Sequence, residues 1–254
     1  AEQSWEPVSM EEPSLIAQQQ FIEEVGKARD EIDIERCALL FASEINPETD
    51  ISKSIAALDQ QVNGYLEGYQ SDPSKTPSNS ALLIDVVGRS LGYRGDTLEY
   101  FSSGNSLFDH VIDNRLGIPI SLAAIYMSVG QRLGIKVHGV GFPGHFLIRV
   151  IEPDGSERLV DPFSHHKLST QDVTALRAST GEQFGQFDEA WLANAHPHDM
   201  LVRMFENLKR VFLNEGNIAA AESCLDYQLI LKPKDSVFLE QLQVLLDQRG
   251  HGVH

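Results

Sequence analysis

The chain has 254 residues, 42% of them hydrophobic, so it can bury a full core as one large domain or two small ones. Its formal net charge of −17, without clustered Lys and Arg, argues against nucleic acid and membrane surfaces as partners. The longest apolar runs fall well short of the roughly 20 residues that cross a bilayer, and we expect a cytoplasmic protein.

The first region, residues 1–75, is predicted to be helical. From Pro13 to about Tyr69, apolar residues recur at three- and four-residue spacing. Asp33 and Asp50 are placed as helix N-terminal residues. The following run QSDPSKTPSNS is rich in Ser and Pro and predicts an exposed connector.

The chain has two cysteines, Cys37 and Cys224, and each lies within an apolar helical pattern. A free thiol in such a setting behaves as a small hydrophobic side chain, so we expect both to be reduced core residues. Sparse cysteine use is typical of the cytosol, although two thiols far apart in sequence can also pair.

The middle region, residues 76–190, changes from helix to strand. SALLIDVVGRSLG predicts a short apolar helix that ends at Gly92. Pro119 begins a second apolar helix, in a first turn where no amide hydrogen is needed. KVHGVGF, HFLIRVIE and ERLVDPF then show strand patterns, and EPDGSE predicts a hairpin turn between the last two. We therefore expect a small antiparallel sheet next to this second helix.

The last region, residues 191–254, is predicted to be helical. It follows a helix from about Ser169 to Thr180 and starts with another around DEAWLANA, before a helix pair from about His198. Large, small and terminating residues occupy the spacing of one 34-residue tetratricopeptide unit, with two mismatches at Lys209 and Gln228. One repeat and a following helix cannot form a free-standing solenoid, so we expect this segment to pack on the middle region.

His145 and Asp161 form the strongest candidate site. His145 enters one predicted strand in GFPGHFLIRV, and Asp161 leaves the next strand, so their side chains are expected to lie close together. A carboxylate there would accept the ring N–H of the histidine and free its second nitrogen for proton transfer. The alternative is that both residues cap strand ends and hold the loop.

The order of these motifs resembles the transglutaminase-like superfamily. A helix opening after a Gly-containing turn is followed by GHFLIRV and LVDPF. The longer string NSLFDHVIDNRLGIPISLAAIYMSVGQRLGIKVHGVGFPGHFLIRV resembles more closely the bacterial SirB family, over about residues 30–248. The resemblance implies an α+β fold with a papain- or transglutaminase-like core, N-terminal helices and a C-terminal tetratricopeptide-like segment.

The resemblance also implies roles for residues. In the superfamily a cysteine at a helix N-terminus precedes a histidine and an aspartate on strands, and the latter two match His145 and Asp161. The cysteine position falls at Pro119 or Ile120, and neither side chain can attack a carbonyl. Ser121 is an alternative nucleophile, although a serine in a first helical turn most often bonds a backbone amide. Cys37 is a less favoured source of sulfur because its sequence setting is apolar.

Further residues are predicted to line the same cleft. They are Asn105, Ser106, Asp109, Asn114, Arg115, Pro119, Gly144 and His165. The alternative for the first group is structural: a helix cap at Asn105 or Ser106, and an ion pair of Arg115 that orders the loop.

A metal site is a weaker alternative. His145, Asp161, His165 and His166 are suitable ligand types for zinc or nickel. However, adjacent histidines in a loop are more often exposed, and no i, i+4 histidine pair supports them. We predict no metal and no other cofactor.

Two functional hypotheses follow from the sequence. In the first, the protein lacks the cysteine nucleophile and is a non-catalytic binder of a peptide or protein. In the second, it hydrolyses amide or ester bonds with Ser121 as nucleophile, His145 as base and Asp161 as orienting partner. We favour the first because loss of the attacking atom removes covalent catalysis.

Overall fold

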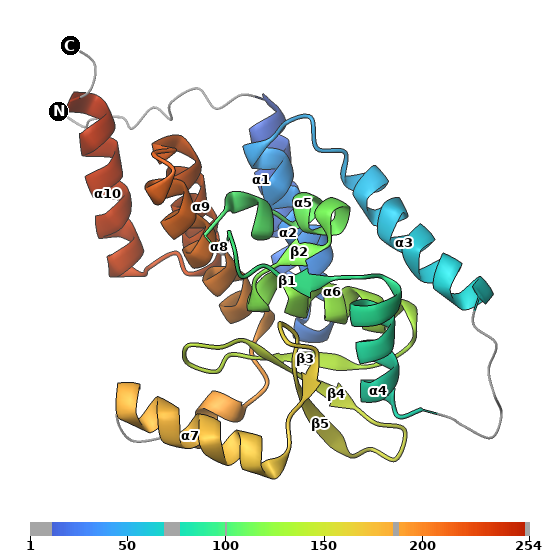
Figure 1. Cartoon of the computed structure of the whole chain (residues 1–254). Helices are drawn as coiled ribbons and strands as arrows, with labels where there is room; N and C mark the ends of the chain where they lie inside the picture. Colours follow the sequence, from blue (N-terminus) through green and yellow to red (C-terminus); the bar gives the residue numbers. More distant parts are fainter. Residues whose placement is uncertain (1–11, 69–76, 100, 185–187, 252–254) are drawn as a thin grey trace.

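The computed structural model describes residues 12–68, 77–99, 101–184 and 188–251 (Figure 1). Most of the predicted connector QSDPSKTPSNS lies outside these residues. Among the helices of the described part, none combines the length and the apolar character that a bilayer span requires.

The N-terminal region is helical, as predicted. Its elements are α1 (Glu12–Val25), the 3₁₀ turn η1 (Arg29–Glu31), α2 (Ile34–Ile45) and α3 (Ile51–Gly68). Asp33 Oδ1 accepts a hydrogen bond from the Arg36 amide at 3.1 Å, and Asp50 Oδ1 accepts one from the Lys53 amide at 3.0 Å. These bonds satisfy amides that helix starts leave unpaired, and they confirm the two predicted N-terminal signals.

The middle region begins with helices and a short strand pair. Its elements are α4 (Asn79–Ile84), the π-helical η2 (Asp85–Ser90), β1 (Arg94–Gly95), the 3₁₀ turn η3 (Ser103–Asn105), α5 (Phe108–Asn114), β2 (Leu116–Gly117) and α6 (Pro119–Arg132). Gly92 has a φ of 75°, as expected of a glycine that ends a helix. Pro119 is the first residue of α6, as predicted. The parallel pairing of β1 with β2 was not predicted, because two-residue strands leave no pattern in sequence.

The main sheet is antiparallel, as predicted. Its strands are β3 (Val137–Val140), β4 (Leu147–Ile151), β5 (Glu157–Asp161) and β6 (His166–Lys167), in the order β3-β4-β5-β6. Ile148 pairs with Val160 and Ile151 with Glu157, so the EPDGSE segment is the predicted hairpin turn. The short β6 was not predicted.

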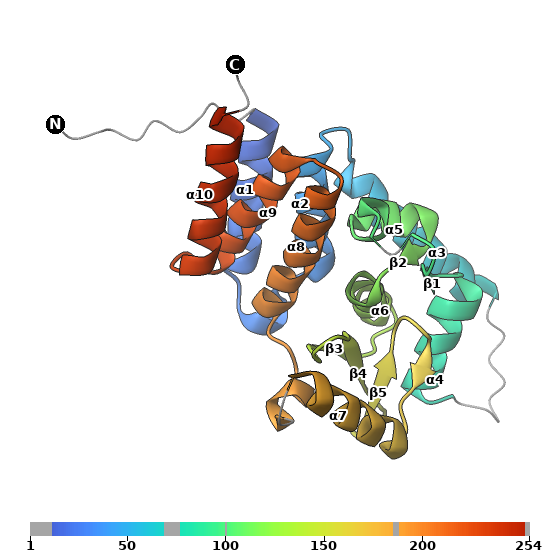
Figure 2. The same cartoon turned by 60° about the vertical axis from the view of Figure 1, so that its left-hand side comes forward.

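The sheet separates two helical layers. Ile148, Val150 and Val160 belong to the main hydrophobic core, which includes α6. The alternate residue Leu147 joins a second, smaller cluster with Phe142 and residues of α7 (Thr170–Phe184) and η4 (Glu189–Leu192). Figure 2 shows α6 on one side of the sheet and α7 on the other. The sequence predicted a longer helix around DEAWLANA, but only the four-residue 3₁₀ turn η4 forms there.

The C-terminal helices are α8 (Pro197–Asn214), α9 (Ile218–Leu231) and α10 (Ser236–His251). Phe205 of α8 and Tyr227 of α9 pack with Phe21 of α1 and Phe41 of α2, with ring centroids 4.7–5.8 Å apart. Burial of aromatic rings is a large favourable contribution, so this cluster joins the first and last regions of the chain. The tetratricopeptide-like character of this segment stays a prediction.

Candidate functional site

The hydroxyl of Ser121 forms hydrogen bonds with backbone groups. The residue is 1% exposed. Its Oγ donates to the Asn105 carbonyl oxygen at 2.8 Å and accepts from the Ile118 amide at 3.0 Å. The second bond is one half of a capping box, which satisfies a free amide at the start of α6. Within the described part of the chain, no hydrogen bond joins Ser121 to His145.

His145 and Asp161 do lie together, on the α7 side of the sheet. Both line a cavity of about 380 Å³ with Leu147, Leu168 and residues of α7. Asp161 bonds its own turn, because Oδ1 accepts from the Phe163 amide at 2.8 Å and Oδ2 accepts from Ser164 Oγ at 2.8 Å. In the described residues, no hydrogen bond links the two side chains. The aspartate therefore holds the loop, which is the structural alternative noted from the sequence.

The three residues of the hydrolase hypothesis are thus divided by the sheet. Ser121 belongs to α6, which packs on one face of the sheet. His145 and Asp161 face the cavity under α7 on the other. The sequence predicted the proximity of the strand residues, but it could not predict which face of the sheet they occupy.

The backbone of the loop before His145 is bonded by a side chain of α8. Gly144 has a φ of 73°, a conformation that glycine adopts without strain. Arg203 of α8 donates to the Phe142 carbonyl oxygen at 3.0 Å and to the His145 carbonyl oxygen at 2.8 Å. The C-terminal segment therefore fixes the backbone of the predicted site.

His165 is bonded into the fold instead of facing a cleft. Its Nε2 lies 2.8 Å from the Tyr93 carbonyl oxygen, and its Nδ1 lies 2.7 Å from the Tyr126 hydroxyl. A carbonyl only accepts, so Nε2 carries the proton and Nδ1 accepts from Tyr126. Burial lowers the pKa of His165 and raises that of Tyr126. A Cβ on Gly88 would lie 2.9 Å from this ring, which explains the glycine there.

The residues predicted from GNSLFDHVIDNR are mostly structural. Asn105, Ser106 and Asp109 are buried. Asn105 Nδ2 donates to the Glu99 carbonyl oxygen at 2.6 Å and to Asp96 Oδ2 at 3.1 Å. Asp109 Oδ2 accepts from Thr49 Oγ1 at 2.8 Å. These bonds anchor the loop and the start of α3 against α5.

The helix cap at Asn105 or Ser106 and the ion pair of Arg115, which the structural alternative predicted, are not found among the described residues. Leu107, whose side chain forms no capping bond, precedes α5, so neither Asn105 nor Ser106 caps that helix. Arg115 ends α5 with a φ of 57° and makes no ion pair within the described residues. Asn114 and Arg115 are both exposed.

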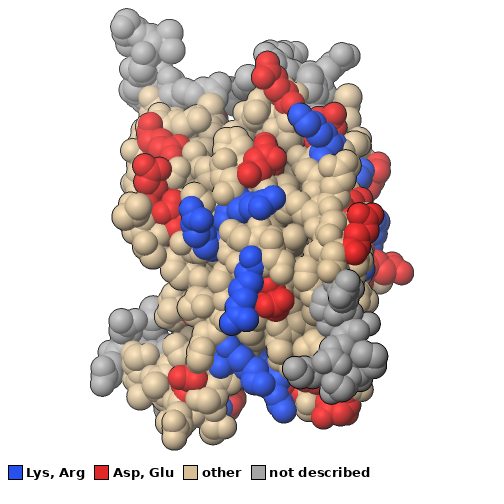
Figure 3. Space-filling model, turned by 45° about the vertical axis from the view of Figure 1, so that its right-hand side comes forward, with Lys and Arg blue, Asp and Glu red and all other residues tan. Residues whose placement is uncertain are grey.

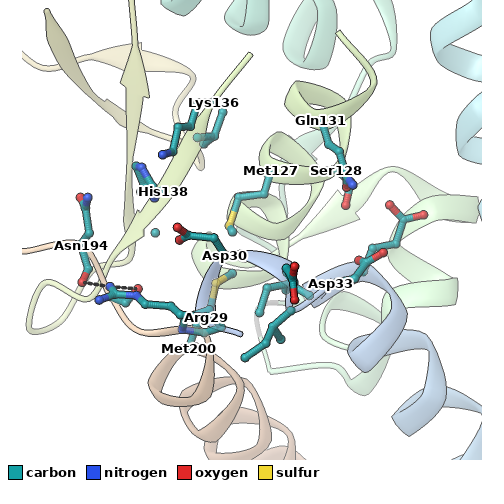
Figure 4. A pocket seen from close by; sticks show the side chains of 18 of the residues that line it. Arg29, Asp30, Asp33, Met127, Ser128, Gln131, Lys136, His138, Asn194 and Met200 are labelled. Carbon is teal, nitrogen blue, oxygen red and sulfur yellow. Dashed lines mark hydrogen bonds between the residues drawn. The ribbon is translucent and has the colours of Figure 1, made fainter. Parts of the chain in front are cut away.

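A larger cavity lies at the other end of α6, and it was not predicted from the sequence. It measures about 840 Å³ and is lined by the link between α1 and α2, the last turns of α6, strand β3 and residues 194–200 (Figure 4). Arg29 closes one side, since its Nη2 donates to the carbonyl oxygens of Asn194 at 3.2 Å and Ala195 at 3.4 Å. The segments that form this cavity are far apart in sequence, so no local motif could reveal it.

The lining of this larger cavity combines apolar side chains with charged side chains of both signs. Its charged side chains are Arg29, Asp30, Glu31, Asp33, Glu35 and Lys136. Figure 4 shows Asp30 pointing into the cavity between His138 and Met127, with Met200 close to it. Burial lowers the pKa of His138, so its imidazole is neutral near pH 7. Such a mixture suits a ligand with both apolar and polar groups.

Among the described residues, neither cavity has a reactive cysteine or a group of side chains arranged to bind a metal ion. Cys37 and Cys224 are free and 0% exposed, which confirms that they are core residues. Burial raises the pKa of both thiols, so neither forms the thiolate that attacks a carbonyl. No group of three or more His, Cys, Asp or Glu side chains within the described ranges is arranged to hold a metal ion.

The surface charge is uneven. Figure 3 shows Lys and Arg side chains following one another down the middle of one face, although the whole chain carries −17. The net charge from which we argued against nucleic-acid partners therefore does not describe this face, and that expectation stays a prediction.

Comparison with known proteins identifies the superfamily of this chain. Residues 49–206 match the family model described as transglutaminase-like superfamily, which covers more than half of the chain. The chain belongs to the transglutaminase-like superfamily. The match extends from α3 into α8, so it is wider than the predicted core of residues 76–190.

The relatives of this transglutaminase-like chain include bacterial and animal proteins. It is 34% identical over 221 residues to a UPF0162 protein of Xylella fastidiosa, covering 84% of this chain and 77% of the relative. It is 24% identical over 209 residues to a UPF0162 protein of Vibrio cholerae, covering 81% and 76%. A 64-residue stretch, 25% of this chain and 10% of the relative, is 37% identical to mouse F-box only protein 21. The name SirB is not among these descriptions, so that finer resemblance stays a prediction.

Proposed function

We propose that this transglutaminase-like protein binds a peptide or protein segment without cleaving it. One observation carries the proposal: the Ser121 hydroxyl bonds Asn105 and Ile118, on the other side of the sheet from His145. The superfamily cysteine position falls at Pro119 or Ile120, so the first turn of α6 supplies no other attacking atom.

The hydrolase alternative would require a large rearrangement. Ser121 would have to leave two backbone bonds, and each lost bond to a buried group is worth about 1–3 kcal/mol. His145 would also have to move to the α6 face, although Arg203 holds its backbone. A nucleophile and base need to lie within hydrogen-bond reach, and this arrangement does not favour that contact.

The partner we expect is a polypeptide, bound without metal or cofactor. A cavity of about 840 Å³ lies within the range of about 300–1,000 Å³ that is typical of ligand sites. It is bounded partly by Pro197 and Met200, so the start of α8 forms one wall of it. This agrees with a role of that segment in widening or bracing a recognition surface.

The catalytic part of the proposal is tested with a fluorophosphonate probe, which labels activated serines. The full chain, Ser121→Ala and the control Ser128→Ala on the same helix are incubated with the probe and with p-nitrophenyl acetate. We expect no labelling and no turnover above buffer in any of them. Labelling that disappears in Ser121→Ala and in His145→Ala, but not in Ser128→Ala, would establish the hydrolase instead.

A further inference from the structure

The turn between β5 and β6, residues 162–165, is anchored by two of its side chains. A Cβ on Gly95 would collide with the Phe163 ring, and a Cβ on Gly88 would lie 2.9 Å from the His165 ring. Interiors are close-packed, so a larger residue at either glycine would push its ring away. The two rings therefore occupy places that exist only because η2 and β1 carry glycine there.

His165 is held in a backbone conformation that is uncommon outside glycine. Its φ is 54°, in the left-handed region, which is strained for a residue with a Cβ. The ring bonds the Tyr93 carbonyl oxygen at 2.8 Å and the Tyr126 hydroxyl at 2.7 Å, and these bonds oppose the strain. If they are lost, nothing in the local backbone preference favours the same conformation.

The bonds of this ring fit the neutral imidazole. Nε2 donates to the Tyr93 carbonyl oxygen and Nδ1 accepts from the Tyr126 hydroxyl. Protonation would add a donor on Nδ1 that faces this hydroxyl. Even if the hydroxyl turned to accept, a positive charge would lie half-buried between α6 and η2. Burial opposes that charge, so the pKa of His165 lies below its usual value of 6.5.

The surroundings of the ring do little to compensate a charge. Asp161 of β5 favours the protonated form, but its oxygens already accept from the Phe163 amide and from Ser164 Oγ. In the described part of the chain, the other charged or titratable side chains on the adjacent elements are accessible to solvent, which screens them. They are Asp85 and Arg89 on η2, Arg94 on β1, and His166 and Lys167 on β6.

The turn leads directly into the wall of the smaller cavity. Asp161 precedes the turn and Leu168 follows β6, and both line the cavity together with His145. The Leu168 amide donates to the Leu159 carbonyl oxygen at 2.9 Å, which extends the pairing of β5 with β6. Because β6 is an edge strand of two residues, this pairing depends on the turn that positions it.

We infer that His165 is a pH-sensitive latch: its neutral ring holds the turn against α6, and protonation releases the turn and loosens the cavity wall formed by Asp161 and Leu168. The inference goes beyond the proposed function and does not depend on it, because the latch lies at the smaller cavity. In acid, the cavity that His145 lines becomes more open.

Nuclear magnetic resonance of the full chain between pH 8 and 5.5 tests the latch. Ring shifts follow the protonation of His165, and hydrogen exchange, corrected for the intrinsic rate at each pH, gives the protection of single amides. From pH 7.5 to 5.5 we expect the Phe163 and Leu168 amides to lose about threefold or more of their protection. The Leu122 amide, bonded to the Ile118 carbonyl oxygen in α6, should keep its protection. At pH 5.5 an ordinary aspartate is still charged, so the carboxylates contribute little.

Variants of the titrating groups show which histidine is responsible. In His165→Gln the pH dependence at Phe163 and Leu168 should disappear, whereas the adjacent His166→Gln should retain it. Tyr126→Phe removes the hydroxyl that favours the neutral ring, so it should raise the pKa of His165 and shift the loss of protection to higher pH. A purely structural role of Tyr126 would not move this pKa.

A glycine variant tests the fit of the ring. Gly88→Ala should displace His165, so the Phe163 amide should be poorly protected even at pH 7.5. The control Gly64→Ala lies on α3, where an added Cβ meets nothing within 4 Å, and should change this protection by less than about twofold.

Three results would overturn the latch. Protection at Phe163 and Leu168 could stay constant while His165 takes up its proton. The pH dependence could persist in His165→Gln. The pKa of His165 could also be unchanged in Tyr126→Phe, which would mean that the ring does not depend on this hydroxyl.

Discussion

The two ends of α6 have opposite characters. At its first turn, Ser121 is buried and its hydroxyl is bonded to the backbone of the chain. At its last turns, Met127 and Gln131 border the cavity of about 840 Å³. The resemblance noted from the sequence implies that the superfamily cysteine lies in this first turn, where Ser121 of this chain bonds the backbone of Asn105 and Ile118. The open surface lies at the other end of the same helix.

On our proposal, this chain keeps the framework of a catalytic site without the chemistry of that site. His145 and Asp161 are present, yet Asp161 stabilises its own turn and His145 faces α7. Function depends on the side chains of a site and not on the fold alone. The following substitutions compare the two ends of α6 by their effects on stability, from the largest to the smallest.

The largest loss is expected at the open end. Arg132 makes two bonds to Glu35, at 2.7 and 3.0 Å, and the two side chains are 16% and 6% exposed. Arg132→Met would leave Glu35 buried without a partner, so the free energy of unfolding should fall by about 3 kcal/mol. Urea denaturation measures it. Combining Arg132→Met with Glu35→Leu should recover most of the loss, and a loss below about 1 kcal/mol in the single variant would show that the pair is not buried.

A smaller loss is expected at the first turn. Ser121→Ala removes the partner of the Ile118 amide and of the Asn105 carbonyl, so the free energy of unfolding should fall by about 2 kcal/mol. The control Ser52→Ala, on the exposed side of α3, should change it by less than about 0.5 kcal/mol. Peptide binding by the folded Ser121→Ala protein should be unchanged. If both variants were equally stable, the hydroxyl would be free and its assignment to the backbone would fail.

The sequence anticipated much of this fold and little of its chemistry. The caps at Asp33 and Asp50, the start of α6 at Pro119 and the hairpin at EPDGSE were all predictable, because each depends on neighbouring residues. The face of the sheet on which His145 lies depends on which helix covers that face, and α7 follows much later in the chain. The cavity at β3 combines three stretches that are far apart in sequence, and no pattern in any one of them indicates it.

A still smaller loss of stability is expected in the middle of α6, and its size depends on pH. His165 accepts from Tyr126 and donates to Tyr93 in its neutral form, and burial lowers its pKa from the usual 6.5. The unfolded chain therefore takes up a proton more readily, so this histidine stabilises the fold at neutral pH and the contribution is lost as pH falls below about 6.5. His165→Gln should lower the free energy of unfolding at pH 7.5 by about 1 kcal/mol and less at pH 5.

His145→Gln provides the comparison for the loss of stability at pH 7.5. Its ring makes no hydrogen bond in the described part of the chain, and the residue is exposed. We expect a change below about 0.5 kcal/mol in urea unfolding at pH 7.5. A larger effect for His145 than for His165 would reverse the roles assigned to the two histidines.

The most direct test of the central claim restores sulfur to α6. In Ser121→Cys, an intact site would place the new thiol beside His145 and activate it as a thiolate. The rate of alkylation by iodoacetamide at pH 7 measures this, against a background of two buried native thiols, Cys37 and Cys224. Our account predicts that the folded variant reacts no faster than the wild-type chain and that adding His145→Ala changes nothing. Rapid alkylation that His145→Ala abolishes would contradict it.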